Sequence, residues 1–440
     1  MDFKNIILPF QDSSTQWDIR IDEGVVTSME PSADKTTPSV MLPSLCHPHI
    51  HLDKLYLLTC NHPRSSNHPD YSDLAPKTGG FQEALANTAE AKKRYTEEDL
   101  YLRGSQLIAT SYKQGVTFMR AFVEVDSVTE LKALEVGLRL KKEFEDFLTV
   151  QICPFAQDPI FSTEKGEANR AMFEKALGQF GSDIEVIGST PYVESDLEAQ
   201  NQNIRWAIET ALKHGKHLDF HIEFNLQGDG THMLVFDHVI EELERLNWPT
   251  YPGAPTVVFG HATRLTLARH DDLVKLSQKL RETRLPIHFV GLPTSDLYMM
   301  GRHGSDGSEQ SEPLSRPCGT IMVPKLIQDY GINACLSVNN VGNPFTPHGD
   351  GDPLKVASLG VGLFLSTRAM DALNPRAEGH HDMFTLAEYH QTMPMLLYKN
   401  EENIEISSVS GSVNVPARQR LSIQDIVWDP PETRLRSIVE

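Results

Sequence analysis

The chain is predicted to be an α/β protein: a (β/α)8 TIM-like barrel with a small β subdomain formed from both chain ends. Short apolar runs alternate with amphipathic stretches from about residue 40 onward, and eight of these runs have the length and composition of strands. A doubly wound open sheet is the alternative, but no GxGxxG or GxxxxGKS pattern follows any of the runs. The alternation therefore favours the barrel.

The individual elements follow from local patterns. Strands are predicted at 40–49, 116–123, 148–153, 185–193, 217–221, 256–261, 287–291 and 334–338. Helices are predicted near 96–115, 129–145, 166–179, 197–214, 231–246, 270–282, 320–330 and 353–372. The clearest helix begins at Thr96-Glu97-Glu98-Asp99, a capping box, and ends at Gly115. In a barrel of this kind the site lies where the strands end.

Both chain ends differ from the middle. Residues 18–26 read as a strand, a turn and a second strand, and residues 424–429 read as another short strand. We therefore expect residues 1–40 and 400–440 to form the small β subdomain and residues 41–399 to form the barrel. Loops 61–80 and 301–317 follow predicted strands, so they either cover the site or are plain surface loops.

The amino-acid composition limits the classes of partner that we expect the chain to bind. The formal net charge of -20 argues against nucleic acid or an anionic membrane surface as partner. The five cysteines are scattered without a CxxC, which excludes a disulfide framework and a thiolate zinc site. No signal peptide or membrane-length apolar run is read, so a cytoplasmic location is expected. A small molecule is the expected partner, and a homo-oligomer stays open.

Four histidines stand at the ends of three predicted strands. His49 and His51 end the first strand, His221 ends the fifth and His261 ends the sixth. One such histidine is more often structural, but four at the same end of a barrel are hard to explain as packing. Three imidazoles can hold a divalent ion and leave a fourth position open. The pattern predicts a metal site at this end.

The segments that carry these residues resemble the amidohydrolase superfamily, and within it the cytosine deaminase branch with its N-isopropylammelide-type hydrolases. The resemblance extends over nearly the whole chain. It rests on His-x-His-Leu-Asp-Lys at 49–54, Asp-x-His at 219–221, Gly-His-Ala-Thr at 260–263, Leu-Pro-Thr-Ser-Asp-Leu-Tyr-Met-Met-Gly-Arg at 292–302, and Asn-Pro-Phe at 343–345 followed by Gly-Asp-Gly-Asp-Pro-Leu at 349–354.

The resemblance implies one divalent metal ion, zinc with iron as the alternative, because no lysine ends the fourth strand to bridge two ions. The family's metal ligands fall on His49, His51, His221 and Asn339. His261 corresponds to the histidine that orients water or substrate. Gln157 corresponds to a glutamine that contacts the substrate ring, and Lys54 is similar to a lysine of hydrolases that act on triazine rings.

The chain lacks acidic residues that the family has at its site. Asn339 stands where the family has an aspartate that binds metal and takes a proton, and Asn340 follows where a second acid is common. Phe224 stands in the place of the catalytic glutamate. Glu223 is either a substitute that transfers protons or a structural ion-pair partner. We count His261, Glu223 and Lys54 as candidate catalytic residues, and Gln157, Asn340 and Phe224 as candidate substrate contacts.

Three functions are compatible with these residues. The first is a metal-dependent hydrolase of C–N bonds in a cyclic nitrogen-containing small molecule, either a deaminase or a cyclic amide hydrolase. The second is a repurposed barrel that catalyses cyclisation, isomerisation, elimination or decarboxylation, with or without metal, since Asn339 also allows that the metal has been lost. The third is a non-catalytic ligand-binding pseudoenzyme.

Overall fold

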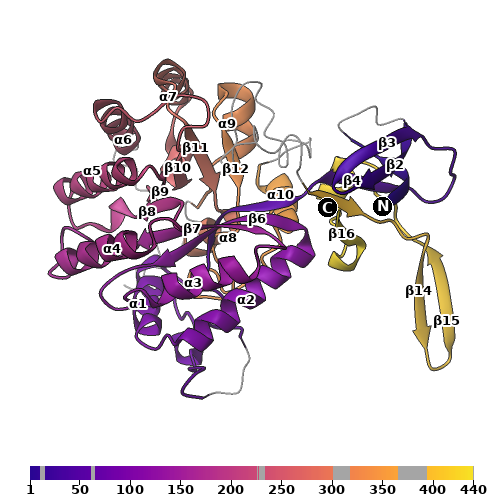
Figure 1. The fold of residues 1–440 in the computed structure, drawn as a ribbon, viewed down its shortest axis with the longest axis horizontal. Helices are drawn as coiled ribbons and strands as arrows, with labels where there is room; N and C mark the ends of the chain where they lie inside the picture. Colours follow the sequence, from indigo (N-terminus) through magenta and orange to yellow (C-terminus); the bar gives the residue numbers. More distant parts are fainter. Residues whose placement is uncertain are drawn as a thin grey trace, which may run out of the picture.

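The computed structural model describes residues 1–9, 15–60, 65–224, 226, 233–300, 318–364 and 394–439. Its centre is an eight-stranded parallel sheet in which the strands follow one another in chain order. These strands are β5 (Leu45–His51), β6 (Val116–Glu124), β7 (Thr149–Ala156), β8 (Val186–Ser189), β9 (His217–Ile222), β10 (Val257–His261), β11 (Ile287–Gly291) and β12 (Ala334–Leu336). The predicted barrel is confirmed (Figure 1).

The barrel closes just beyond β12. The Asn339 amide nitrogen donates to the His49 carbonyl over 3.1 Å, and the His51 amide nitrogen donates to the Asn339 carbonyl over 2.9 Å. The Ser337 hydroxyl adds a 2.7 Å bond to the His49 carbonyl. Strand pairing thus fixes the segment that follows β12 directly beside the end of β5.

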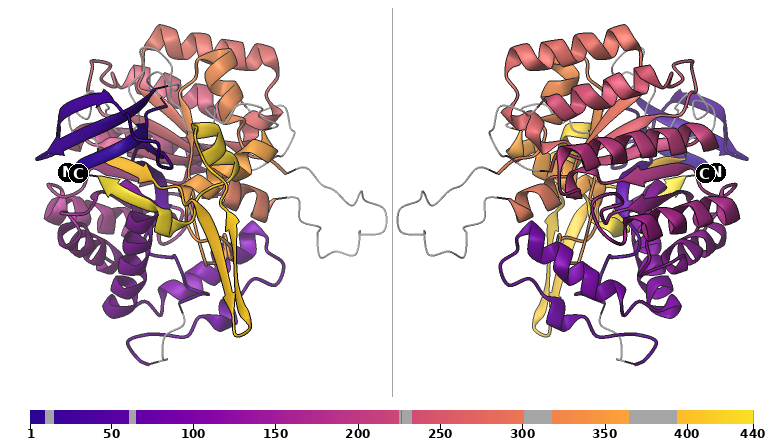
Figure 2. Two further views of the ribbon diagram at one scale, coloured as in Figure 1. Left: turned by 90° about the vertical axis from the view of Figure 1, so that its right-hand side faces the viewer. Right: turned by 90° about the vertical axis from the view of Figure 1, so that its left-hand side faces the viewer.

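Helices surround the barrel (Figures 1 and 2). In α2 (Glu97–Gln114) the Thr96 side chain accepts from the Asp99 amide and Gly115 caps the end at φ 99°, as the sequence predicts. The other long helices are α3 (Lys132–Glu143), α4 (Gly166–Phe180), α5 (Leu197–His214), α6 (Leu234–Arg245), α7 (His270–Thr283), α9 (Val323–Tyr330) and α10 (Pro353–Leu363). The connections add α1 (Phe81–Lys92), α8 (Pro293–Met299), η1 (Ser72–Leu74), η2 (Pro191–Val193) and η3 (Thr263–Leu267).

Both chain ends build a six-stranded sheet beside the barrel, with the two termini close together (Figure 1). Its strands, in spatial order, are β16 (Arg436–Val439), β13 (Met395–Tyr398), β4 (Ser39–Pro43), β1 (Asp2–Ile7), β2 (Gln16–Asp22) and β3 (Val25–Pro31). A separate hairpin, β14 (Asn403–Ser408) and β15 (Gly411–Pro416), projects from this region. The η6 turn (Thr433–Leu435) precedes β16. The expected small β subdomain is thereby confirmed as part of the fold.

Three predicted strands are wrong in detail. The strand predicted at 185–193 ends at Ser189 as β8, because Pro191 begins the η2 turn. The run 40–49 is not one strand: it divides at Ser44 into β4, which joins the small sheet, and β5, which joins the barrel. Residues 424–429 do not form a strand, because α12 (Ile423–Trp428) occupies them. Ser422 caps α12 by accepting from the Asp425 amide, and the buried positions Ile423, Ile426 and Val427 have helical rather than alternating spacing.

The loop 301–317 lies outside the described residues, as do 61–64 of the loop 61–80, so the idea that these loops cover the site stays a prediction. Within the described part of the chain, no helix is both long and apolar enough to cross a membrane.

A buried ion pair joins the small sheet to the barrel. The Arg436 guanidinium of β16 binds both carboxylate oxygens of Asp352 at 2.9 and 2.8 Å, and both side chains are about 1% exposed. Arg436 also donates to the backbone carbonyls of Gln114 and Pro431. The Asp352 carboxylate in turn caps α10 at the Leu354 amide. The last strand is therefore held to the ends of two barrel helices.

We expect Arg436→Ala to lower the free energy of unfolding by about 3–5 kcal/mol, because it leaves the buried Asp352 carboxylate without its partner. Arg434→Ala is the matched control: its pair with Glu401 is solvent-exposed, so a much smaller loss of stability is expected. Denaturant unfolding of both variants measures the difference. Equal losses of unfolding free energy in the two variants would contradict the stabilising role of the buried Arg436–Asp352 pair.

Candidate functional site

Three histidines from two strands converge at the C-terminal end of the barrel. His49 and His51 end β5, and His221 lies on β9. The Nε2 atom of His221 is 3.0 Å from the Nε2 atoms of both His49 and His51. All three are at most 2% exposed, and they are the group of potential metal ligands found in the described part of the chain.

A local irregularity of β5 decides which histidines face the centre. The register of β5 against β6 shifts between His47 and Ile50, at the position of Pro48. Simple alternation would place His47 on the same side as His49 and His51. Instead His47 turns toward α2, where its Nε2 is 3.1 Å from the Ser111 hydroxyl. Only two of the three closely spaced histidines reach the site.

The three converging imidazoles fit a divalent ion. Burial lowers the pKa of His49, His51 and His221 well below the usual range, because desolvation disfavours the imidazolium form. A hydrogen bond between two Nε2 atoms needs a proton on one of them, and a neutral imidazole carries only one N–H group. Nitrogen lone pairs aimed at one point are the donor set of three-histidine metal sites.

A buried ion pair lies on the other side of His49. Asp219 Oδ2 accepts from Arg120 Nη1 over 2.8 Å, and both side chains are fully buried. Asp219 Oδ1 is 3.7 Å from His49 Nδ1. Burial raises the pKa of Asp219 to about 7, although Arg120 opposes the shift. A carboxyl group on this side favours the tautomer with hydrogen on Nδ1, which leaves the His49 Nε2 lone pair directed at the cluster.

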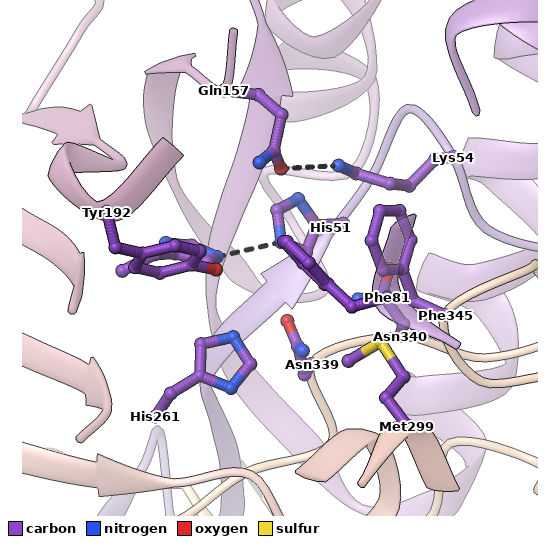
Figure 3. Close-up of a pocket in the computed structure, with 11 residues that line it drawn as sticks. His51, Lys54, Phe81, Gln157, Tyr192, His261, Met299, Asn339, Asn340 and Phe345 are labelled. Carbon is purple, nitrogen blue, oxygen red and sulfur yellow. Dashed lines mark hydrogen bonds between the residues drawn. The ribbon is translucent and has the colours of Figure 1, made fainter. Parts of the chain in front are cut away.

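Asn339 reaches the same centre from the barrel closure. Its backbone is left-handed, with φ 64°, a conformation that asparagine tolerates better than most residues. The side-chain Nδ2 donates to the Ser295 hydroxyl over 2.9 Å, and Oδ1 is buried without a hydrogen-bond partner in the described structure. Figure 3 places Asn339 between His261 and His51. Its role as a metal ligand stays a prediction.

His261 is oriented by an acid. Its Nδ1 lies 2.7 Å from Asp296 Oδ1, and Asp296 Oδ2 accepts from the Thr320 hydroxyl over 2.7 Å. Burial raises the pKa of Asp296, while His261 opposes the shift. Because a carboxylate only accepts, Nδ1 carries the proton and the Nε2 lone pair is left over. Asp296 lies in the Leu-Pro-Thr-Ser-Asp segment that the sequence analysis singled out. Its contact with His261 was not predicted from the sequence.

Lys54 and Gln157 line the pocket next to one another (Figure 3). Lys54 Nζ donates to Gln157 Oε1 over 3.1 Å and to Glu124 Oε1 over 2.5 Å. Glu124 in turn pairs with Lys92 at 2.8 Å. Sequence reasoning missed Glu124 and Lys92. An acid at the very end of the second barrel strand was the available signal for Glu124.

An apolar wall completes the pocket. Phe81, Tyr192, Met299 and Phe345 line it together with the polar residues (Figure 3). Phe224 stands behind this wall: its ring packs 5.2 Å from Phe81 and 5.0 Å from His261, measured between ring centroids. No pattern in the sequence marked Phe81 as a pocket residue. Tyr192 was predicted to lie within the strand 185–193, but it lies in the η2 turn that follows β8.

Glu223 takes part in an ion pair outside the pocket lining. Its Oε2 accepts from Arg264 Nη1 over 2.5 Å, and Gln200 approaches Oε1 at 3.4 Å. Glu223 does not continue the strand alternation that begins at His221, because β9 ends at Ile222 and Glu223 has a left-handed φ of 50°. Of the two alternatives for Glu223, the geometry favours the structural ion pair over proton transfer.

Comparisons with known proteins agree with this fold. No protein-family model matches the chain. N-isopropylammelide isopropyl amidohydrolase from Pseudomonas sp. (strain ADP) is 25% identical over 322 residues, 73% of this chain and 68% of that protein. The fold matches that of 5-methylcytosine deaminase from Klebsiella pneumoniae with a TM-score of 0.68 at 19% identity, covering 93% of this chain and 100% of that one.

A second solved structure, N-isopropylammelide isopropylaminohydrolase from Burkholderia multivorans ATCC 17616, matches with a TM-score of 0.61 at 18% identity, covering 90% of this chain and 91% of that one. Both solved structures share the fold of this chain. The chain is thus similar in sequence to one N-isopropylammelide hydrolase, and it shares its fold with a 5-methylcytosine deaminase and a second N-isopropylammelide hydrolase.

Proposed function

We propose that the protein is a metal-dependent hydrolase of C–N bonds in a small cyclic nitrogen compound, acting as a deaminase or a cyclic amide hydrolase. The observation that carries the proposal is the convergence of three buried, neutral imidazoles beside the His261–Asp296 pair. The names of the relatives support it, since their stated substrates are cyclic nitrogen compounds.

His49, His51 and His221 would hold the ion through their Nε2 atoms, with the Asn339 amide oxygen as a further ligand. A bound divalent ion, zinc or alternatively iron, lowers the pKa of water and polarises the group under attack. Lys54 and Gln157 would orient the ring from the other side of the pocket, while the apolar wall keeps bulk water out.

His261 is proposed to hold and move the proton. Its Nδ1–H donates to Asp296, so its Nε2 accepts a proton from the attacking water and passes it to the leaving nitrogen. Asp296 offsets the charge that forms on the imidazole. In this proposal His261 takes the proton-transfer role of the family's acids, which Phe224 and Asn339 replace here. Glu223 is not needed for proton transfer and pairs with Arg264.

Asn339 and Phe224 also favour a second candidate. Without two acids of the family, the same pocket would suit a non-hydrolytic reaction such as a cyclisation, isomerisation, elimination or decarboxylation. Such a reaction need not depend on metal, so metal dependence separates the two candidates.

We expect the purified wild-type protein to bind about one equivalent of zinc, because three neutral histidines are a sufficient ligand set. His221→Ala removes the central ligand and is expected to lose the metal. His47→Ala, on the same strand as His49 and His51 but turned toward Ser111, is the matched control and should retain the metal. Metal analysis by mass spectrometry after zinc loading decides, and retention in both variants would contradict the site.

Removal of the metal with a chelator is expected to abolish release of ammonia or amine from aminated pyrimidines or triazines, or ring opening of cyclic amides, and zinc is expected to restore the reaction. The product assay is run on the same preparation before, between and after these steps. Turnover that is indifferent to the chelator would favour the non-hydrolytic candidate.

We expect His261→Asn to lower kcat by roughly 10²–10⁴-fold with metal content unchanged, since it removes the proton carrier but no ligand. Asp296→Asn should reduce kcat less, because the proton carrier remains and only its partner changes. Steady-state kinetics of both variants with metal analysis tests this. A His261 variant with normal kcat would refute the assignment.

A further inference from the structure

We propose that the hairpin of β14 and β15 is a dimerisation arm, and that its apolar face packs against the same face of a second copy of this chain. The arm comprises residues 403–416 and stands apart from the barrel (Figure 1). Assembly through this arm does not depend on the chemistry proposed for the pocket.

The two strands of the arm place their large apolar side chains on one face. Ile404 pairs with Val415 across the hairpin, and Ile406 pairs with Val413. Directly paired residues point to the same side of a sheet, and so do residues two positions apart on one strand. The four side chains therefore form one patch. The alternating positions make the opposite face polar, with Asn403, Glu405, Ser407, Ser412 and Asn414.

This apolar patch is open to solvent. Ile406 and Val413 are 62% and 60% exposed, and all other positions of the two strands are exposed as well. Val409 at the tip of the arm is fully exposed. Among the described strands, β14 and β15 pair only with one another. An isolated two-stranded hairpin is at most marginally stable in water, so the arm needs a surface that covers its apolar face.

The base of the arm is fixed although its faces are bare. The Ala417 amide donates to the Glu402 carbonyl over 2.9 Å, directly below the hairpin. The Asn400 side chain donates to the carbonyls of Pro38 and Arg420 over 2.8 Å each, and it accepts from the Arg420 amide over 2.9 Å. The arm is therefore held in one direction before a partner binds, which reduces the entropy lost on association.

The charge distribution favours a second copy as the occupant of this face. Two copies carry the same formal net charge of -20, so they repel one another at long range. The arm carries one charged residue, Glu405, and that residue lies on the polar face. The apolar face can therefore meet its own kind without bringing like charges together. A membrane would find neither a basic nor an aromatic side chain on the arm.

The size of the arm fits a dimer in which both copies contribute equally. A standard interface takes roughly 20–30 residues a side, and two-fold dimers pair one patch with itself. The arm alone, residues 403–416, is about half of such a patch. In a two-fold dimer the arms meet at the axis, and each tip reaches the partner beyond its arm. Each copy then supplies its arm and the surface that receives the partner's tip, which brings a side to roughly two dozen residues.

Sedimentation velocity of the full-length wild-type protein at micromolar concentrations is expected to show a dimer. Ile406→Lys places a charge in the centre of the apolar patch and is expected to raise the dissociation constant by at least about tenfold. Val413→Lys, on the paired strand, is expected to do the same. Ser407→Lys adds the same charge to the polar face and should leave the dimer intact. Equal thermal unfolding midpoints of the barrel show that all three variants are folded.

A wild-type protein that stays monomeric at the highest soluble concentration would overturn the proposal. A dimer that neither Ile406→Lys nor Val413→Lys weakens would overturn it too, and so would a dimer that Ser407→Lys weakens as much as they do. In a monomer, hydrogen exchange of the arm identifies the actual occupant. Protected arm amides would mean that other residues of this chain cover the face, and fast exchange would mean that a different protein has to do so.

Discussion

The site depends on the hydrogen bonds that close the barrel between β5 and the segment beyond β12. These bonds join the backbones of His49, His51 and Asn339. They hold two histidines and the two asparagines that follow β12 on one rim, while the parallel ladder from β6 to β9 carries His221 to the same rim. Closing the sheet is therefore what brings residues nearly 300 positions apart into one pocket.

Different residues supply the hydrogen-bond acceptors and the hydrogen-bond donors of the pocket. His261 and the Asn339 oxygen offer lone pairs near the histidine cluster, whereas Lys54 brings N–H donors next to Gln157 in the pocket lining. Each set is supported from behind by buried charge: Asp296 behind His261, and Glu124 with Lys92 behind Lys54. Charges buried in this way are costly unless they are paired, so the pairs hold these side chains in one orientation.

Sequence patterns predicted the barrel and the histidines well, because strand periodicity and strand ends are local properties. They failed where geometry is set by an irregularity or by distant partners. The shift at Pro48 turns His47 outward, the left-handed Glu223 breaks the expected alternation, and Ser44 divides one predicted strand between two sheets. The pairing of His261 with Asp296 and of Lys54 with Glu124 depends on tertiary contacts that no single sequence displays.

The central claim is that His49, His51 and His221 together form one metal centre. A crystal structure of the zinc-loaded protein, with anomalous data at the zinc edge, tests it most directly. We predict one peak at about 2.0–2.1 Å from all three Nε2 atoms. A peak at another place, or none after loading, would contradict it.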